Sequence, residues 1–297
     1  MRIRRTAATT LAALALVSVA ACGKSGSPAA GSDSATTAGY TVRTDAKLDG
    51  SATVAAAKKR GKLVIGAKAD QPFLGFDDPV AGTRTGFDIE IAKMVAADLG
   101  FSPSQIEWKT IPSANRETAI SGGDVDYYVG TYTINDKRKA QVGFAGPYYI
   151  AGQDLLVQKG NTDITGAEST KDRNVCSATG STSIDRIKTF GAKVTAYDTY
   201  STCVEKLLSK DVDAVTTDDA ILMGYAAKNA DQLKVVGKPF STEKYGIGLN
   251  KDDTVLRGAI DDAIAAHEAN GDWKKAFDAT LAKSGSTAPQ VPALERY

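Results

Sequence analysis

The sequence predicts an α/β fold of two lobes, each a mostly parallel sheet flanked by helices, joined by two hinge crossings. Strand-like and helix-like segments alternate through the folded region, which favours parallel strands with crossover helices. The folded region from Asp45 to Ser284 has about 240 residues, enough for one large or two modest domains. The last segments are expected to return to the first lobe after a complete second lobe.

The first lobe is expected at residues 45–150 plus 246–284. A strand is predicted at Leu63–Ala67, and Phe87, Ile91 and Val95 mark one face of a helix that ends at Gly100. The other expected elements are strands at 106–109, 125–129 and 245–249, short helices after Ser113 and Thr133, and helices at 254–269 and 273–282.

The second lobe is expected at residues 151–245. It would contain strands at 155–158, 175–177, 194–197 and 213–216, and helices at 184–190, 201–210 and 220–228. The chain would cross between the lobes near Tyr149–Gln153 and Ser241–Gly246. Two crossings make a hinge that can close around a ligand.

The N-terminal segment, residues 1–21, reads as a signal peptide. Three arginines lie ahead of an apolar run from Ala7 to Ala21, which is shorter than the roughly 20 predominantly apolar residues of a membrane span. The run ends in Val19-Ala20-Ala21-Cys22, which resembles the lipobox of bacterial lipoproteins. The resemblance implies lipidation of Cys22, so the protein would be exported and anchored to the outer face of the cytoplasmic membrane; ordinary cleavage beside an incidental cysteine is the alternative.

The composition on either side of the folded region differs from that of the lobes. Residues 22–44 are rich in Gly, Ser, Ala and Thr and are expected to form a flexible tether. Residues 285–297 form a polar tail. The formal net charge is +1, so nothing indicates a nucleic-acid partner.

The remaining cysteines, Cys176 and Cys203, are expected to form a disulfide, because an exported pair is normally bridged. Two unpaired buried thiols are the alternative. The pair lacks further ligands for a metal. The sole histidine, His267, falls in the helix expected at 254–269 and is predicted to be a surface residue outside the cleft, which excludes a Ser/His triad. We therefore expect no cofactor, no metal and no enzymatic activity.

Several short motifs follow one another along the folded region. They are Leu63-Val64-Ile65-Gly66, Asp70-Gln71-Pro72-Phe73, Gly86-Phe87-Asp88, Gly123-Asp124-Val125-Asp126, Thr131-Tyr132-Thr133, Phe144-Ala145-Gly146-Pro147-Tyr148, Gly180-Ser181-Thr182, Asp213-Ala214-Val215 and Tyr245-Gly246-Ile247. In their order and spacing these motifs resemble the family 3 solute-binding proteins, the polar amino-acid receptors of ABC importers. The resemblance implies a periplasmic-binding-protein-like fold, an amino-acid ligand and an ABC permease as partner. We also expect a monomer.

The resemblance also implies roles for single residues. Arg138 matches the arginine that binds the ligand's α-carboxylate, together with Thr133, Ser181 and Thr182. Asp218 matches the acid that binds the α-ammonium, with Thr131 beside it. The sequence departs from the family at Asp70, where many members place an aromatic residue that stacks on the ligand.

Two threonines have the spacing of helix starts. Thr133 precedes Asp136 by three residues, and Thr182 precedes Asp185 by three, so we expect both to begin helices whose free N–H groups face a carboxylate. The alternative is that both are simple caps and that Arg138 is solvated in a charged run.

The segment Pro112–Thr118 and the paired cysteines resemble the glutamate-binding lipoproteins of the family. Glutamate would need a second cation in a dry cleft, because an uncompensated buried charge is unfavourable. The candidates are Arg116 and Lys68; alternatively, Arg116 pairs with a nearby acid and Asp70 neutralises Lys68. The alternatives to a glutamate importer protein are a glutamine or aspartate receptor and a lipoprotein that senses amino acids for a membrane partner.

Overall fold

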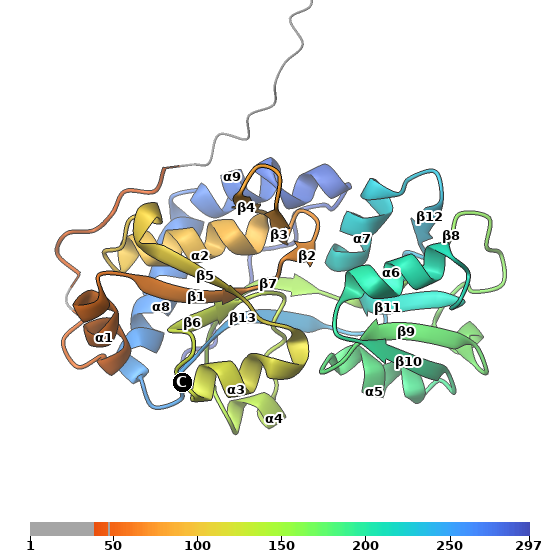
Figure 1. The fold of residues 1–297 in the computed structure, drawn as a ribbon, viewed down its shortest axis with the longest axis horizontal. Coiled ribbons are helices and arrows are strands. Elements are labelled where there is room, and N and C mark those ends of the chain that lie inside the picture. Colours follow the sequence, from red (N-terminus) through yellow and green to blue (C-terminus); the bar gives the residue numbers. More distant parts are fainter. Residues whose placement is uncertain (1–38, 47) are drawn as a thin grey trace, which may run out of the picture. The chain divides into compact units, whose positions relative to one another are not determined.

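The computed structural model describes residues 39–46 and 48–297. The expected signal peptide and the lipidation site Cys22 lie outside the described residues. The described residues fold around two five-stranded sheets and one three-stranded sheet (Figure 1). Within the described ranges, none of the helices is long and apolar enough to cross a membrane.

The first sheet has the strand order β5-β1-β6-β13-β7. Helices α2, α8 and α9 pack on one another along one side, and α3 contacts β6 and β13. The strands are β1 (Leu63–Ala67), β5 (Ile106–Thr110), β6 (Tyr127–Val129), β7 (Gly143–Ala151) and β13 (Glu243–Leu249), and the helices are α1 (Ala52–Arg60), α2 (Phe87–Asp98), α3 (Arg116–Ser121), α4 (Asp136–Lys139), α8 (Thr254–Ala269) and α9 (Asp272–Ala279).

The second sheet has the strand order β10-β9-β11-β8-β12. Its helices follow its strands in alternation, as the sequence predicts. The strands are β8 (Gln153–Gln158), β9 (Asn174–Ala178), β10 (Lys193–Tyr197), β11 (Ala214–Asp218) and β12 (Leu233–Val235), and the helices are α5 (Thr182–Lys188), α6 (Tyr200–Leu208) and α7 (Asp219–Lys228).

The two-lobed fold is confirmed, and each sheet is mixed in its pairing. In the first sheet β1 pairs in parallel with β5 and β6, whereas β13 runs antiparallel to β6 and β7. In the second sheet β8 runs antiparallel to β11 and β12. The reversed strand of each sheet is the one by which the chain arrives from the other lobe, so the crossings create the antiparallel pairs.

The sequence prediction lacks the small third sheet, in which β3 (Gly75–Asp78) pairs with both β2 (Asp70–Gln71) and β4 (Thr83–Thr85). These strands are short and mostly polar, so they carry little of the apolar alternation by which strands are recognised. Asp70 begins β2, three residues beyond the end of β1, and pairs with Phe76 of β3.

The segments on either side of the lobes pack against them through aromatic side chains. Tyr40, in the expected tether, donates a hydrogen bond to Glu90 at 2.9 Å. In the expected polar tail, the backbone N–H of Glu295 donates to the carbonyl of Gly146, and the Tyr297 hydroxyl accepts from the N–H of Phe144. The packed chain therefore begins before Asp45 and continues beyond Ser284.

His267 lies in α8, as predicted, but the prediction that it is a surface residue is wrong. The imidazole is buried, with Nδ1 3.0 Å from Asp272 and Nε2 3.5 Å from Asp98. The cause is the packing of α8 against α2 and α9, whose acidic side chains surround the ring.

Strands β7 and β13 lie side by side and carry the chain between the two sheets (Figure 1). An aromatic cluster packs around them: the ring of Tyr149 lies 5.7 Å from that of Tyr245, 5.8 Å from Phe87 and 6.5 Å from Phe277. The indole N–H of Trp273 donates to the carbonyl of Tyr148 at 2.9 Å. Large buried rings in contact give the crossing strands a firm support in the first lobe.

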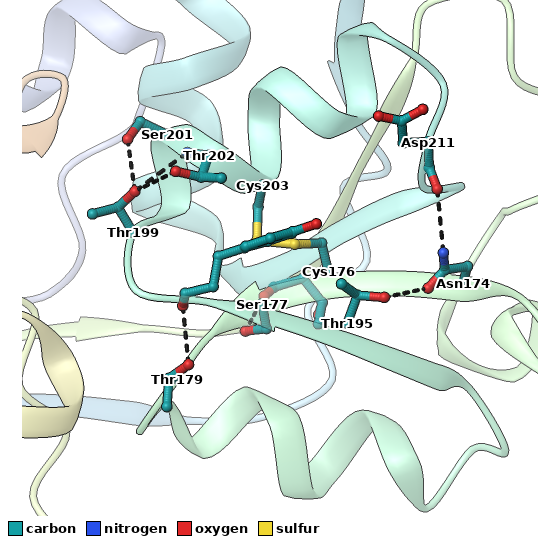
Figure 2. Close-up of a disulfide and its surroundings, with 12 residues drawn as sticks. Asn174, Cys176, Ser177, Thr179, Thr195, Thr199, Ser201, Thr202, Cys203 and Asp211 are labelled. Carbon is teal, nitrogen blue, oxygen red and sulfur yellow. Dashed lines mark hydrogen bonds between the residues drawn. A yellow bond between two sulfur atoms is a disulfide. The ribbon is translucent and has the colours of Figure 1, made fainter.

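The predicted disulfide between Cys176 and Cys203 is confirmed. Figure 2 shows that it joins β9 to α6, and both cysteines are fully buried. Strand β9 leads directly to Gly180 and Ser181, so the bond ties that loop to α6.

Replacing both cysteines by alanine is expected to lower the free energy of unfolding by about 3–4 kcal/mol, because the bond closes a loop across 27 positions of the chain. Urea denaturation of the wild-type and Cys176→Ala/Cys203→Ala proteins measures this difference. Equal denaturation midpoints would contradict it. Dithiothreitol should shift the midpoint of the wild-type protein and leave that of the double variant unchanged.

Candidate functional site

A cavity of about 920 Å³ opens between the two lobes. The first lobe contributes residues around α3 and α4, and the second lobe contributes the Gly180 loop and α5. The cavity reaches four of the eight predicted ligand contacts, Thr133, Arg138, Ser181 and Thr182. The sequence therefore brings residues from both lobes to one opening.

The other four predicted contacts lie in the protein interior. Lys68 is 4% exposed, Arg116 2%, Thr131 6% and Asp218 4%, and none of them lines the cavity. Arg138, at 6% exposed, belongs to both groups because it is buried and also lines the cavity. Its guanidinium marks the boundary between the open cavity and the buried polar interior.

The two predicted helix starts are each displaced. Helix α4 begins at Asp136, and its cap is Asn135, whose side chain accepts from the N–H of Arg138 at 2.9 Å. Helix α5 is capped by Ser181, whose hydroxyl accepts from the N–H of Ser183. Neither Thr133 nor Thr182 is a cap, because the neighbouring Asn and Ser offer the same capping chemistry at the position where the backbone turns.

Arg138 and Arg116 converge on one peptide carbonyl of the second lobe. Arg138 donates to Gly180 at 3.0 Å and to Thr133 at 2.7 Å. Arg116 donates to the same Gly180 oxygen at 3.4 Å and to the Thr131 carbonyl at 3.4 Å. The Nε atom of Arg116 also donates to the Ser113 carbonyl at 3.1 Å. The two bonds from its terminal nitrogens are long, so these nitrogens retain capacity for a stronger acceptor.

An aromatic ring lies beside both guanidinium groups. The Cζ atom of Arg116 is 4.3 Å from the ring centroid of Tyr132, and that of Arg138 is 5.0 Å from it. The Nε atom of Arg138 also lies 3.3 Å from a carboxylate oxygen of Glu117. Burial and the neighbouring Arg116 lower the pKa of Arg138 to about 10. The ring and the carboxylate offset the repulsion between two buried cations.

Lys68 adds a third cation to this cluster. Its ammonium donates to the Ser113 hydroxyl at 2.6 Å. Burial, followed by the charge of Arg116, lowers the pKa of Lys68 to about 7, and Asp70 opposes that shift. The ammonium is therefore poorly compensated, and an anion beside it would raise its pKa.

Asp218 supplies the carboxylate of the interior. One oxygen accepts a hydrogen bond from the hydroxyl of Tyr245 at 2.7 Å, and the other is buried without a partner. Burial, then the nearby charge of Glu243, raises the pKa of Asp218 to about 7. A buried carboxylate with an unpartnered oxygen is suited to a cationic group such as an ammonium.

The hinge strand β13 also holds the segment that carries Thr131 and Thr133. Thr133 bridges to Tyr245, the N–H of Ile134 donates to the carbonyl of Lys244 at 2.8 Å, and the N–H of Gly246 donates to Tyr132 at 3.0 Å. Backbone hydrogen bonds therefore join the hinge strand β13 to the segment that carries Thr131 and Thr133.

Sequence reasoning missed several residues of the site. Tyr132 and Tyr245 stood in the motifs quoted above, but nothing in the pattern indicated that their side chains face Arg138 and Asp218. No sequence pattern indicated Glu243, which lies at the second crossing. The residue is 1% exposed, and its carboxylate accepts a hydrogen bond from the Thr182 hydroxyl at 3.3 Å. Only the tertiary fold brings these groups together.

Comparison with known proteins identifies this arrangement. Residues 63–281 match the bacterial extracellular solute-binding proteins, family 3. The chain belongs to this family. The family predicted from the sequence motifs is therefore confirmed, and the cavity between the lobes of this solute-binding protein lies between the elements that carry those motifs.

Individual relatives span nearly all of this solute-binding protein. The glutamate-binding protein GluB of Corynebacterium efficiens is 38% identical over 274 residues, covering 88% of this chain and 93% of the relative. The ABC transporter glutamine-binding protein GlnH of Bacillus subtilis is 34% identical over 265 residues, covering 89% and 92%. The solved structure of an ancestral arginine-binding protein bound to arginine has a TM-score of 0.69 at 36% identity, covering 74% of this chain and 97% of that one.

Replacing Tyr245 by phenylalanine is expected to raise the pKa of Asp218 above about 7, because the hydroxyl bond favours the ionised carboxylate. The carboxyl ¹³C shift of Asp218, followed by NMR across a pH titration, measures the change. The control is Tyr128→Phe, whose hydroxyl donates to the Ile111 carbonyl instead. An unchanged pKa in Tyr245→Phe, or equal shifts in both variants, would refute the role of Tyr245.

Proposed function

We propose that this protein is the extracytoplasmic substrate-binding lipoprotein of an amino-acid ABC importer, and that it binds glutamate between its lobes by hinge closure. The observation that carries the proposal is the buried group of three cations, Lys68, Arg116 and Arg138, with Asp218 beside them. The names of the relatives GluB and GlnH support an amino-acid ligand.

The α-amino acid group carries two charges that match those of Arg138 and Asp218 in sign. Its carboxylate would accept hydrogen bonds from the guanidinium of Arg138 and from the hydroxyls of Thr133, Ser181 and Thr182. These four residues line the same cavity. Its ammonium would donate a hydrogen bond to the unpartnered oxygen of Asp218. This positive charge would favour the ionised form of the Asp218 carboxylate. Thr131 would contribute on the same side.

The cations beyond Arg138 favour an acidic side chain. A carboxylate is a stronger acceptor for Arg116 than the Gly180 carbonyl at 3.4 Å, since charge assistance strengthens the bond. It would also favour the protonated form of Lys68, which burial and Arg116 disfavour. Glutamine would bring no second carboxylate to Arg116 and Lys68, so the ligand would leave their charges less well compensated.

The proposal assigns the protein no catalysis. The chain's sole histidine, His267 of α8, lies 3.0 Å from Asp272 of α9 and does not line the cavity. Among the described residues there is no cluster of His, Cys, Asp and Glu that could hold a metal ion. We propose a monomer whose lobes comprise residues 45–150 plus 246–284 and 151–245, attached to the outer face of the membrane through a lipid on Cys22 and delivering its ligand to an ABC permease.

Arg138→Ala is expected to weaken the binding of every amino acid at least about 30-fold, because all share the α-carboxylate and truncating a buried charged partner costs roughly 2–5 kcal/mol. Isothermal titration calorimetry with glutamate, glutamine, aspartate and arginine measures the loss. The matched control is Lys137→Ala, which removes a neighbouring exposed cation that lines the cavity. Near-normal binding by Arg138→Ala would end the assignment of Arg138 to the α-carboxylate.

Arg116→Ala is expected to lose at least about tenfold more affinity for glutamate than for glutamine, since only glutamate brings a second carboxylate. The same calorimetric titrations, made with both ligands on wild type and variant, give the ratio. Equal losses for the two ligands, or a wild-type preference for glutamine, would overturn the acidic ligand while leaving an amino-acid receptor in place. Glutamine is the second candidate because of the relative GlnH.

A further inference from the structure

Two glycines of the second lobe lie tightly against the backbone of the first lobe. A Cβ atom on Gly224, in the middle of α7, would lie 2.5 Å from the carbonyl oxygen of Pro72. A Cβ atom on Gly180, which has a φ of +81°, would lie 2.8 Å from the backbone of Ala114. Neither position has room for a side chain while the lobes stand in this arrangement.

Gly224 is the more informative of the two. Glycine is a poor helix former, so its place inside α7 (Asp219–Lys228) needs another reason than helix stability. The contact with Pro72 supplies that reason, because α7 belongs to the second lobe and Pro72 follows β2 of the first. Gly180, by contrast, also accepts hydrogen bonds from both arginines of the site, so its effects would be mixed.

Polar contacts surround the approach of Gly224. One carboxylate oxygen of Asp70 accepts from the backbone N–H of Ser201 at 3.1 Å and from the Tyr225 hydroxyl at 3.0 Å. The same hydroxyl lies 2.6 Å from the Asp70 carbonyl oxygen. The Lys228 ammonium lies 5.4 Å from the Phe73 ring centroid. We call this set the latch: Asp70, Pro72 and Phe73 of the first lobe with Ser201, Gly224, Tyr225 and Lys228 of the second.

The latch is separate from the cavity. None of its residues lines the cavity, which opens beside α3, α4 and α5. Its first-lobe segment is fixed by the small sheet of β2, β3 and β4, and Ser201 lies in α6, which the disulfide of Cys203 joins to β9. Both halves of the latch are therefore held by rigid elements.

We propose that the latch sets ligand affinity by stabilising the closed arrangement of the lobes, and that Asp70 acts in lobe closure instead of contacting the ligand. The proposal rests on the proposed function. Apparent affinity is the intrinsic affinity multiplied by the fraction of binding-competent protein. Weakening the latch should therefore raise the dissociation constants of all ligands by one common factor.

The choice of variant follows from the charges. Asp70 also acts electrostatically on Lys68, so replacing Asp70 would disturb both the latch and the cations of the site. Gly224→Ala changes no charge and should keep or raise the stability of α7 itself. The matched control is Gly258→Ala, also inside a helix, where a Cβ atom meets nothing within 4 Å.

The test compares the full chains of wild type, Gly224→Ala and Gly258→Ala by calorimetry and by thermal unfolding without ligand. Gly224→Ala is expected to raise the dissociation constants of glutamate and glutamine by about tenfold each, and its thermal unfolding without ligand should still be a single cooperative transition. Gly258→Ala is expected to leave both constants unchanged. Unchanged affinity in Gly224→Ala, or weakening for one ligand alone, would overturn the proposal.

A second variant keeps the test decisive if Gly224→Ala does not fold. Tyr225→Phe removes the hydroxyl that donates a hydrogen bond to Asp70, and it is expected to raise the dissociation constants of glutamate and glutamine equally, by about threefold. Unchanged dissociation constants would overturn the proposed role of the latch. If the wild-type protein binds no amino acid, the proposed function fails separately. Small-angle scattering then decides the latch: ligand-free Gly224→Ala should be more extended than wild type and Gly258→Ala, and identical profiles would overturn it.

Discussion

The antiparallel pairing of β7 and β13 is the constraint on which the rest of this structure depends. These strands carry the chain between the sheets, and β13 also holds the Thr131–Ile134 segment by backbone hydrogen bonds. Through the Tyr245 hydroxyl the same strand reaches Asp218 of the second lobe. The aromatic cluster around Tyr149 packs against these two strands. The same packing therefore supports the hinge and positions the binding groups.

The interior of the cleft holds charges that are only partly compensated. Burial lowers the pKa of Lys68 and raises that of Asp218, each to about 7, so both groups resist their charged forms. Peptide carbonyls, the Tyr132 ring and Glu117 offset part of the charge of the two arginines. A ligand with charges of both signs would favour the ionised form of each group, which links recognition to the electrostatics of the site.

The sequence predicted elements that have strong apolar periodicity and missed what depends on exact tertiary placement. Helix α8 occupies the residues predicted for it, Thr254–Ala269, because its buried face repeats regularly. The caps were wrong at Thr133 and Thr182, because Asn135 and Ser181 compete with the same chemistry one or two positions away. The small sheet, the buried side chain of Glu243 and the contact at Gly224 involve partners distant in the sequence, and no local pattern reports them.

The separation of the latch from the cavity bears on how such a receptor can evolve. Substitutions at Gly224 and Tyr225 leave the charges around Arg138 unchanged, and substitutions around the cavity leave the residues of the latch in place. Selection could then adjust the ligand concentration at which the receptor is half-saturated without changing its ligand specificity. A lineage that moves between rich and poor environments has two independent sets of positions on which mutation can act.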